Sequence, residues 1–254
     1  MQSARFFMYR RFRKKGIKMI VITKSLKDDF IKVGVPPENI LVASDGVDAE
    51  VINQEENKPS NKESARNILN LPLGKKLIVY TGSLFKWKGV YTLANTAKLL
   101  PEVLFIVVGG DERGDEKELR DYLDRNNIRN VMVTGYIKSE ETVRSYLAAA
   151  DVLILPNSAK DVVSLKYTSP LKMFSYMAAR RPIIASNLPS LREVLNENNS
   201  LLVKPDDASA LADGLKTVLS DEPLAARIAQ KSFEDVKKYS WESRAENILN
   251  FIKK

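Results

Sequence analysis

From residue 76 onward the chain alternates between short apolar runs and segments with helical spacing. The apolar runs occupy residues 76–81, 103–108, 130–134, 151–155, 182–185 and 201–203. Each is followed by a stretch in which apolar residues recur at steps of three and four, as in Leu93, Ala97 and Leu100. Strands that are apolar throughout and alternate with helices are typical of a parallel sheet covered on both faces. We therefore predict an α/β fold, with a doubly wound, Rossmann-like parallel sheet and right-handed crossovers.

The region before this alternation is much shorter. Residues 18–23 and 40–43 are predicted strands, joined by a helix over residues 26–33 that begins after Ser25 and ends at Gly34. One such strand–helix–strand unit is too small to hold a core alone.

Two further segments have their own character. Residues 53–62 are polar and show no periodicity, which indicates a linker. Residues 207–253 favour helices only, with a break at residues 239–241 before the last one.

The composition removes several kinds of chemistry. The 254 residues include no cysteine and no histidine. Disulfides, thiolate metal sites and a histidine general base are therefore excluded. No apolar run approaches the length of a membrane span, and the N-terminus lacks the pattern of a secretory signal, so we expect a cytoplasmic protein.

The positive charge of the chain is concentrated at its start. Residues 1–18 contain seven basic residues and no acid: Arg5, Arg10, Arg11, Arg13, Lys14, Lys15 and Lys18. Outside them the sequence has 33 basic and 32 acidic residues, which argues against nucleic-acid binding by the body of the protein. Aromatic residues interleave with these cations. The segment is either a peripheral contact with anionic lipid at the inner face of the membrane or a helix that packs on another part of the protein.

Small residues follow the predicted strands at one edge of the sheet. Gly82 and Ser83 follow the first run, Gly109 the second, and Gly135 and Tyr136 the third. Glycine allows sharp turns and close approach of a ligand, although it is also common in ordinary strand–helix turns. Because ligands of open parallel sheets bind outside the carboxyl ends of the strands, we expect a crevice here.

The most favourable site for an anion is the helix that begins near residue 169. Ser169 is a good helix cap and Pro170 suits the first helical position. The free amides and the dipole of such an end attract phosphate. Lys172 in the first turn and Lys88, in the loop after the first strand, could meet the same anion; each could instead be an ordinary surface lysine. Neither the dinucleotide fingerprint nor the Walker motif is present, which disfavours those two nucleotide-binding classes.

Several stretches in this order resemble retaining glycosyltransferases of family 4, the group 1 transferases with the two-domain GT-B fold. The longest is residues 167–179, Tyr-Thr-Ser-Pro-Leu-Lys-Met-Phe-Ser-Tyr-Met-Ala-Ala, followed by Arg-Pro-Ile-Ile-Ala-Ser at residues 181–186. Shorter ones are Thr-Gly-Ser-Leu at residues 81–84, Lys-Gly-Val at residues 88–90 and Gly-Val-Asp at residues 46–48. The resemblance covers residues 18 to 253.

The resemblance implies a donor-binding half of such an enzyme. Residues 1–48 would be a remnant of the acceptor domain, 49–62 an interdomain linker, 63–238 the nucleotide-sugar domain and 239–254 a crossover helix. Residues 46–48 would form the hinge. Lys88 would act on the donor diphosphate as the catalytic cation. Further donor-binding positions would be Gly82, Ser83, Gly109, Gly135, Tyr136, Tyr167, Thr168, Ser169, Leu171, Lys172 and Ser175.

Three positions depart from the family pattern. Ser83 stands where the family usually has an arginine, and Tyr167 and Ser175 stand where it has two glutamates. The second glutamate normally holds the ribose, so Ser175 weakens that expectation.

The expected reaction is transfer of a hexosyl group from a nucleotide sugar to a lipid-linked or glycan acceptor, with retention and without a metal or another cofactor. The alternatives are a donor-binding subunit that works with a separate acceptor-domain chain, a remnant that no longer binds nucleotide, and a regulatory nucleotide-binding domain.

Overall fold

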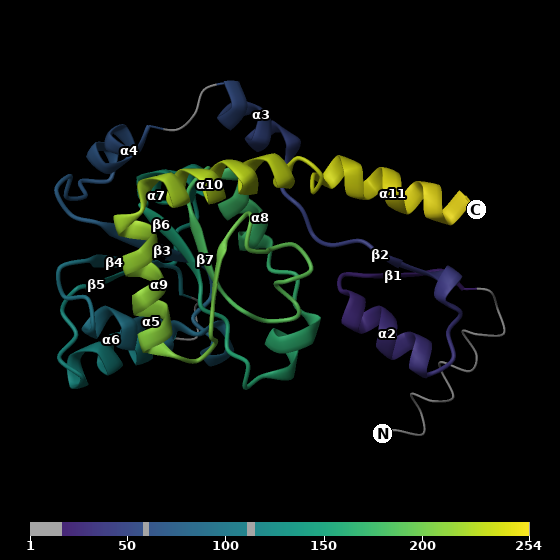
Figure 1. The fold of residues 1–254 in the computed structure, drawn as a ribbon, viewed down its shortest axis with the longest axis horizontal. Coiled ribbons are helices and arrows are strands. Elements are labelled where there is room, and N and C mark those ends of the chain that lie inside the picture. The colour runs from purple at the N-terminus through teal and green to yellow at the C-terminus, as the bar shows by residue number, and fades with distance from the viewer. Residues whose placement is uncertain (1–16, 58–60, 111–114, 254) are drawn as a thin grey trace.

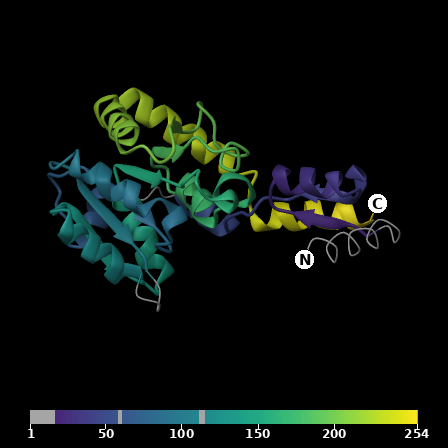
Figure 2. The ribbon, with the colours of Figure 1, turned by 90° about the horizontal axis from the view of Figure 1, so that it is seen from below.

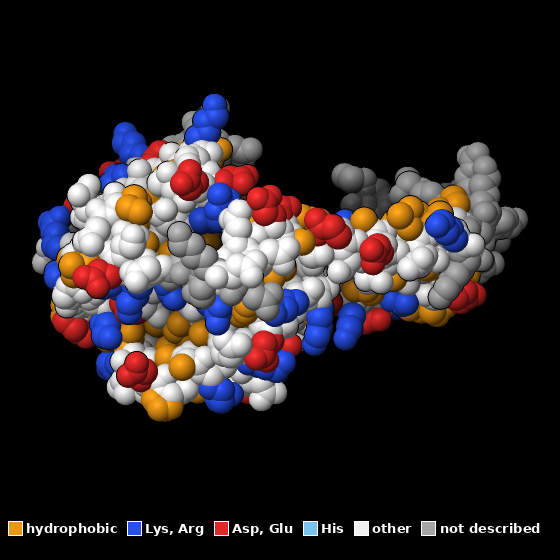
Figure 3. All heavy atoms as spheres, turned by 90° about the horizontal axis from the view of Figure 1, so that it is seen from above, with side chains coloured by type: hydrophobic (Ala, Val, Ile, Leu, Met, Phe, Trp, Pro, Cys, Tyr) orange, Lys and Arg blue, Asp and Glu red, His pale blue; other side chains and the backbone are white. Residues whose placement is uncertain are grey.

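The computed structural model describes residues 17–57, 61–110 and 115–253. The prediction made for residues 1–18 falls almost entirely outside these ranges. Across the described residues the chain forms a large lobe joined by a narrow waist to a smaller one that holds the first strands and the last helix (Figure 1, Figure 3).

The large lobe is built on a parallel sheet of six strands in the order β5-β4-β3-β6-β7-β8. The strands are β3 (Leu77–Thr81), β4 (Leu104–Val108), β5 (Val131–Gly135), β6 (Val152–Leu155), β7 (Ile183–Ser186) and β8 (Leu201–Val203). Each predicted apolar run forms one of these strands. The doubly wound parallel sheet is therefore confirmed.

Alternate residues of each strand enter two separate cores, because successive side chains of a strand point to opposite faces. Leu77 and Val79 of β3 belong to one core, whereas Ile78 and Tyr80 belong to the other. Both faces are covered, which is why the strands are apolar at every position.

Helices cover the two faces as separate groups. The first core is closed by α4 (Lys62–Ile68), α7 (Glu140–Ala149) and α8 (Leu171–Ala178), and the second by α5 (Val90–Lys98), α6 (Asp115–Arg125) and α9 (Ala208–Ser220). Helix α10 (Glu222–Val236) packs against both α8 and α9.

The small lobe contains the predicted strand–helix–strand unit. Strands β1 (Met19–Val21) and β2 (Ile40–Val42) pair in parallel, and α2 (Lys24–Lys32) connects them. Its helix cap is Thr23, whose side chain accepts from the amide of Leu26, and not Ser25 as the sequence suggested.

The last helix, α11 (Trp241–Lys253), returns to this unit (Figure 1, Figure 2). Val47 forms a parallel bridge with Ser240, so the chain enters and leaves the large lobe side by side. Beyond the bridge, the guanidinium of Arg244 donates to the carbonyl of Ser44 at 3.0 Å, and Lys18 Nζ donates to that of Phe251 at 2.7 Å.

The predicted linker is not irregular over most of its length. Ala49–Asn57 form helix α3, which contacts α8. Ile52 is buried in the first core. The apolar face of α3 therefore packs on the large lobe, although the segment is mostly polar.

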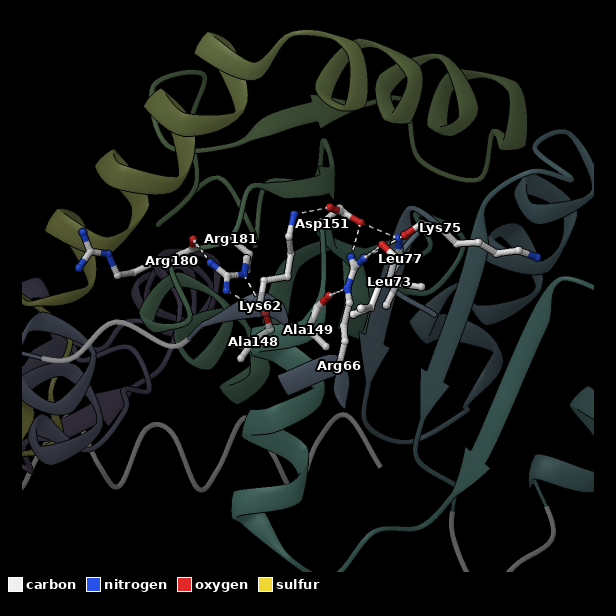
Figure 4. Close-up of polar contacts among 10 residues, drawn as sticks. All are labelled: Lys62, Arg66, Leu73, Lys75, Leu77, Ala148, Ala149, Asp151, Arg180 and Arg181. Carbon is white, nitrogen blue, oxygen red and sulfur yellow. Dashed lines mark hydrogen bonds and ion pairs between the residues drawn. The ribbon is translucent and has the colours of Figure 1, made fainter. Parts of the chain in front are cut away.

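A buried ion pair fastens α4 beneath the sheet (Figure 4). Arg66 pairs with Asp151 at 2.6 Å and also donates to the carbonyls of Leu73, Lys75 and Ala149. Asp151 also accepts from the amide of Leu77 at 2.8 Å.

The surface of the described residues is mixed in charge. Basic and acidic side chains both occur across the face shown in Figure 3. In the described part of the chain, no helix has the length and apolar character needed to cross a bilayer.

Candidate functional site

The strand order reverses in the middle of the sheet, where β3 lies beside β6. Connections from these two strands run in opposite directions, which leaves a crevice at their carboxyl ends. Thr81 ends β3, Leu155 ends β6, and both predicted lysines lie near this point of the sheet.

The glycines at this rim make room for protein atoms. A Cβ on Gly109 would lie 2.0 Å from the carbonyl oxygen of Gly82, and both residues have positive φ. A Cβ on Gly135 would lie 2.6 Å from a carboxylate oxygen of Glu116. The structure therefore gives Gly109 and Gly135 a packing role, and their contact with a donor stays a prediction.

A cavity of about 450 Å³ opens at the rim on the side of α7 and α8. We call it the rim cavity. Four predicted site residues line it: Tyr136, Leu171, Lys172 and Ser175. The hinge residues 46–48 and Trp241 close its side toward the small lobe.

The ammonium group of Lys172 is the polar group of this site that most lacks interaction partners. Its ammonium nitrogen is buried and has no hydrogen-bond partner among the residues that the structure describes. It lies 3.7 Å from the centre of the Tyr80 ring, and a Cβ on Gly82 would approach it to 3.0 Å. The absent side chain of Gly82 is thus what leaves space for the ammonium group.

Lys88 is held by a short turn formed by Lys86–Lys88, before α5. Its ammonium nitrogen lies 3.8 Å from the centre of the Trp87 ring. Lys88 does not line the rim cavity, yet its charge acts on Lys172.

The two lysines share an environment that disfavours their charge. Burial lowers the pKa of Lys88 to about 8. Burial, and then the charge of Lys88, hold the pKa of Lys172 well below its usual value. Among the described residues neither lysine forms an ion pair. Two neighbouring cations without a carboxylate form a site that an anion would stabilise.

The predicted phosphate-binding turn has a different construction. Helix α8 begins at Leu171, Pro170 occupies the N-cap position before it, and no side chain of the described residues caps it. The hydroxyl of Ser169 instead accepts from the amide of Asp45 at 3.0 Å, which ties the turn to the hinge. The prediction that Ser169 caps this helix is therefore wrong, and its amides stay uncapped by side chains. Thr168 is buried beside it.

The positions that depart from the family pattern have separate surroundings. Tyr167 lies outside the rim cavity and donates to Asp29 of α2 at 2.5 Å. Ser83 also lies outside it, and its carbonyl accepts from the Tyr80 hydroxyl at 2.6 Å. Ser175 lines the cavity but offers no carboxylate.

Sequence reasoning missed the polar group at the outer end of the rim cavity. It consists of Glu55, Lys138, Glu140 and Arg144. Glu55 falls in the predicted linker, Lys138 precedes α7, and Glu140 and Arg144 lie in α7, where charged surface residues are common and give no functional signal. Only the tertiary structure brings α3 and α7 to the same opening.

No group of three or more acidic side chains with the geometry of a metal site occurs within the described ranges. The expectation of metal-free chemistry stays a prediction.

Comparison with known proteins gives this geometry a context. A D-inositol 3-phosphate glycosyltransferase of Corynebacterium urealyticum is 27% identical over 203 residues, which are 75% of this chain and 46% of that protein. The chain spans about half the length of the curated relatives it matches.

Solved structures share the fold. HepE of Anabaena, solved in complex with UDP, superposes with a TM-score of 0.80 at 20% identity, over 95% of this chain and 65% of that one. A sucrose-phosphate synthase of Thermosynechococcus elongatus gives a TM-score of 0.76 at 25% identity, over 92% of this chain and 57% of that one.

The sequence profile of the family described as glycosyl transferases group 1 matches residues 75–221, which include the whole sheet and both lysines. This match covers more than half of the chain. The chain therefore belongs to the group 1 glycosyltransferases.

Proposed function

We propose that the rim cavity binds a nucleoside diphosphate sugar and that Lys88 and Lys172 hold its diphosphate. The observation that carries this proposal is the buried, unpaired ammonium group of Lys172 beside a second lysine. An anion that contacted both ammonium groups would compensate two desolvated charges that otherwise repel each other.

The surroundings of the two lysines fit the remaining parts of such a donor. The uncapped amides at the start of α8 add donors for phosphate oxygens. Tyr136 is 72% exposed and Leu171 56% exposed, so both offer apolar surface at the mouth of the cavity to a base or a sugar. The binding of UDP and of UDP-glucose by HepE, which shares the fold, supports the same class of ligand.

In the reaction we propose, the bond between the anomeric carbon and the diphosphate breaks, and the diphosphate leaves with the electron pair. The oxygen of an acceptor hydroxyl, on a lipid-linked or glycan acceptor, forms the new bond, and its proton passes to an oxygen of the departing nucleoside diphosphate. The lysines stabilise the charge that grows on the leaving group. Retention at the anomeric carbon, a cytoplasmic location and the absence of a metal are parts of this proposal that rest on resemblance and composition.

A second candidate is a nucleotide-binding subunit that is not catalytic by itself and requires an acceptor-domain chain. It is favoured by Ser175, which cannot act as a carboxylate toward ribose, and by Tyr167, which faces Asp29 of the small lobe.

Calorimetric titration with UDP and GDP tests the binding proposal. We expect binding by the unaltered chain, and loss of about 1.5–3 kcal/mol for Lys172→Met or Lys88→Met, as for hydrogen bonds to charged groups. Lys86→Met is the matched control, since Lys86 is in the same turn but its side chain is 77% exposed and paired with Glu118.

No binding of either nucleotide at millimolar concentration would refute the proposal. Hexosyl transfer from a radiolabelled nucleotide sugar, measured with and without a candidate acceptor-domain chain, separates the enzyme from the subunit.

A further inference from the structure

A second cavity, of about 600 Å³, is lined by Lys86 and Trp87 of the turn before α5 and shares no lining residue with the rim cavity. It is bordered by α5 and α6, which lie next to each other in Figure 1, and by the loop after β6. We call it the α5–α6 cavity. None of the residues assigned above to the donor site lines it.

Three aromatic side chains line the α5–α6 cavity: Trp87, Tyr91 and Tyr122. The two tyrosine rings meet edge to face, with centroids 4.9 Å apart. The Trp87 ring stacks on that of Phe85, with centroids 6.3 Å apart, and the ammonium group of Lys88 lies over the Trp87 ring. These rings are fixed by their neighbours and partly exposed, so they offer rigid apolar faces to a ligand.

The charges of the α5–α6 cavity balance. Three cations, Lys86, Arg125 and Lys160, are matched by three carboxylates, Glu118, Asp161 and Asp206. Lys86 already pairs with Glu118 at 3.2 Å. A free phosphate would meet as many negative as positive groups here, in contrast to the two unpaired lysines of the rim.

Two carboxylates of this cavity, Asp161 and Asp206, are held in place by backbone amides and can still accept hydrogen bonds. One oxygen of Asp206 accepts from the amide of Ala159 at 2.8 Å, and one oxygen of Asp161 accepts from that of Val163 at 2.8 Å. In the described part of the chain the second oxygen of each has no hydrogen-bond partner. Fixed acceptors and donors around aromatic faces suit a ligand with many hydroxyl groups and apolar C–H faces.

We propose that the α5–α6 cavity binds a neutral oligosaccharide segment, at a site separate from the rim cavity. The C–H faces of the sugars stack on Trp87 and Tyr122, and their hydroxyls bind the carboxylates of the facing loop. The site does not require that the rim cavity bind a nucleotide.

The two tryptophans of the chain allow a direct test, because Trp87 lines the α5–α6 cavity and Trp241 lines the rim cavity. The indole N–H signals of the full chain are followed by NMR and assigned with Trp87→Phe and Trp241→Phe. The probes are maltohexaose, mannohexaose and chitohexaose, each added up to its solubility limit.

We expect at least one probe to shift the Trp87 signal in a saturable way while the Trp241 signal stays in place. Tyr122→Ala should raise the dissociation constant roughly 3- to 10-fold, the loss of one aromatic contact. Glu118→Ala should also weaken binding, because this carboxylate lines the cavity and holds Lys86 and Tyr91 in place. Leu99→Ala is the control, since Leu99 is exposed on the end of α5 and does not line the cavity.

Three results would overturn the proposal: no shift of Trp87 by any probe, shifts that Tyr122→Ala and Glu118→Ala leave unchanged, or saccharide binding that moves Trp241 and is displaced by UDP. Titration of UDP into the same sample tests the rim cavity separately, through Trp241.

Discussion

The buried ammonium group of Lys172 is costly to folding, and in the proposed function the same group binds the donor diphosphate. Its ammonium nitrogen is buried without a partner, and such a group disfavours the folded state. It lies at the crevice where the strand order reverses. Loss of stability at a site that a ligand later satisfies is typical of functional positions.

Lys172→Met should therefore raise the free energy of unfolding by about 1–3 kcal/mol at pH 7 while it weakens nucleotide binding by about 1.5–3 kcal/mol. The pKa of Lys172 is lowered in the folded state, so the unfolded state binds more protons between the folded and unfolded values. Stability of the unaltered protein consequently rises with pH in that window, and the advantage of the variant should shrink by pH 9.5. Urea denaturation at both pH values measures this; an equal advantage at both would contradict it.

Nucleotide binding should take up protons near pH 8 to 9. Burial lowers the pKa of Lys88 to about 8, and a bound diphosphate would raise it again by favouring the charged form. Affinity should then fall as pH rises above 8. Calorimetry in two buffers of different ionisation enthalpy gives the number of protons taken up. Identical apparent enthalpies in the two buffers would show that the lysines do not titrate on binding.

Asp151 illustrates a buried charge with a structural purpose. Burial raises its pKa, but hydrogen bonds from Lys62, Leu77 and Arg66 outweigh this and hold the pKa below its usual value. Asp151→Asn leaves the Arg66 guanidinium buried without its counter-ion, at a cost of about 3–5 kcal/mol. The contribution is present above the unfolded pKa and is lost as pH falls through the folded one.

Urea denaturation at pH 7 checks this cost, with Asp124→Asn as the control. Asp124 is 69% exposed in its pair with Arg129, so its replacement should change stability by less than about 0.5 kcal/mol. Equal effects of the two substitutions would show that burial of the pair is unimportant.

At the scale of elements, the turn before α5 depends on one glycine. Gly89 has a φ of 80°, and a Cβ there would lie 1.7 Å from the carbonyl oxygen of Pro156. The backbone of this turn therefore touches the loop after β6, and that contact positions Lys88 beside Lys172.

Gly89→Ala should lower the free energy of unfolding by at least about 1–3 kcal/mol and displace Lys88, with a larger relative loss of nucleotide affinity. Gly74→Ala is the matched control, because a Cβ there has nothing within 4 Å and Gly74 is not among the glycines of positive φ. That substitution should be neutral or slightly stabilising. Thermal denaturation and UDP titration measure both effects, and a harmless Gly89→Ala would contradict the close approach.

At the scale of the molecule, the two lobes are joined by a few specific contacts as well as by the chain. Both carboxylate oxygens of Glu193 accept from the amide of Lys24, at 2.8 and 2.9 Å, at the start of α2. Tyr167 and Asp29 join the same helix to the large lobe. The small lobe is thus tied directly to the loops that border the site.

Glu193→Gln should increase hydrogen exchange in α2 and β1, because a charged acceptor at a helix start contributes about 0.5–2 kcal/mol. Exchange in the six-stranded sheet should not change. The control is Glu197→Gln, whose exposed carboxylate pairs with Arg192 of the same loop and with no other side chain in the described part of the protein. Hydrogen–deuterium exchange mass spectrometry reports both regions. Equal exchange in α2 for the two variants would show that Glu193 does not hold the lobes together.

The periodicity of apolar residues determined the sheet, because strands buried on both faces must be apolar at every position, as Leu77 and Ile78 are. It also placed Lys88 and Lys172 at one rim, since carboxyl ends of parallel strands share an edge. The sequence did not determine that α3 docks through Ile52, or that Ser169 binds the hinge instead of capping α8. Short polar segments have several local hydrogen-bonding options of similar energy, and contacts from distant parts of the chain decide among them. For the same reason the polar mouth of the rim cavity and the α5–α6 cavity emerged only from the tertiary structure, which assembles each of them from side chains far apart in sequence.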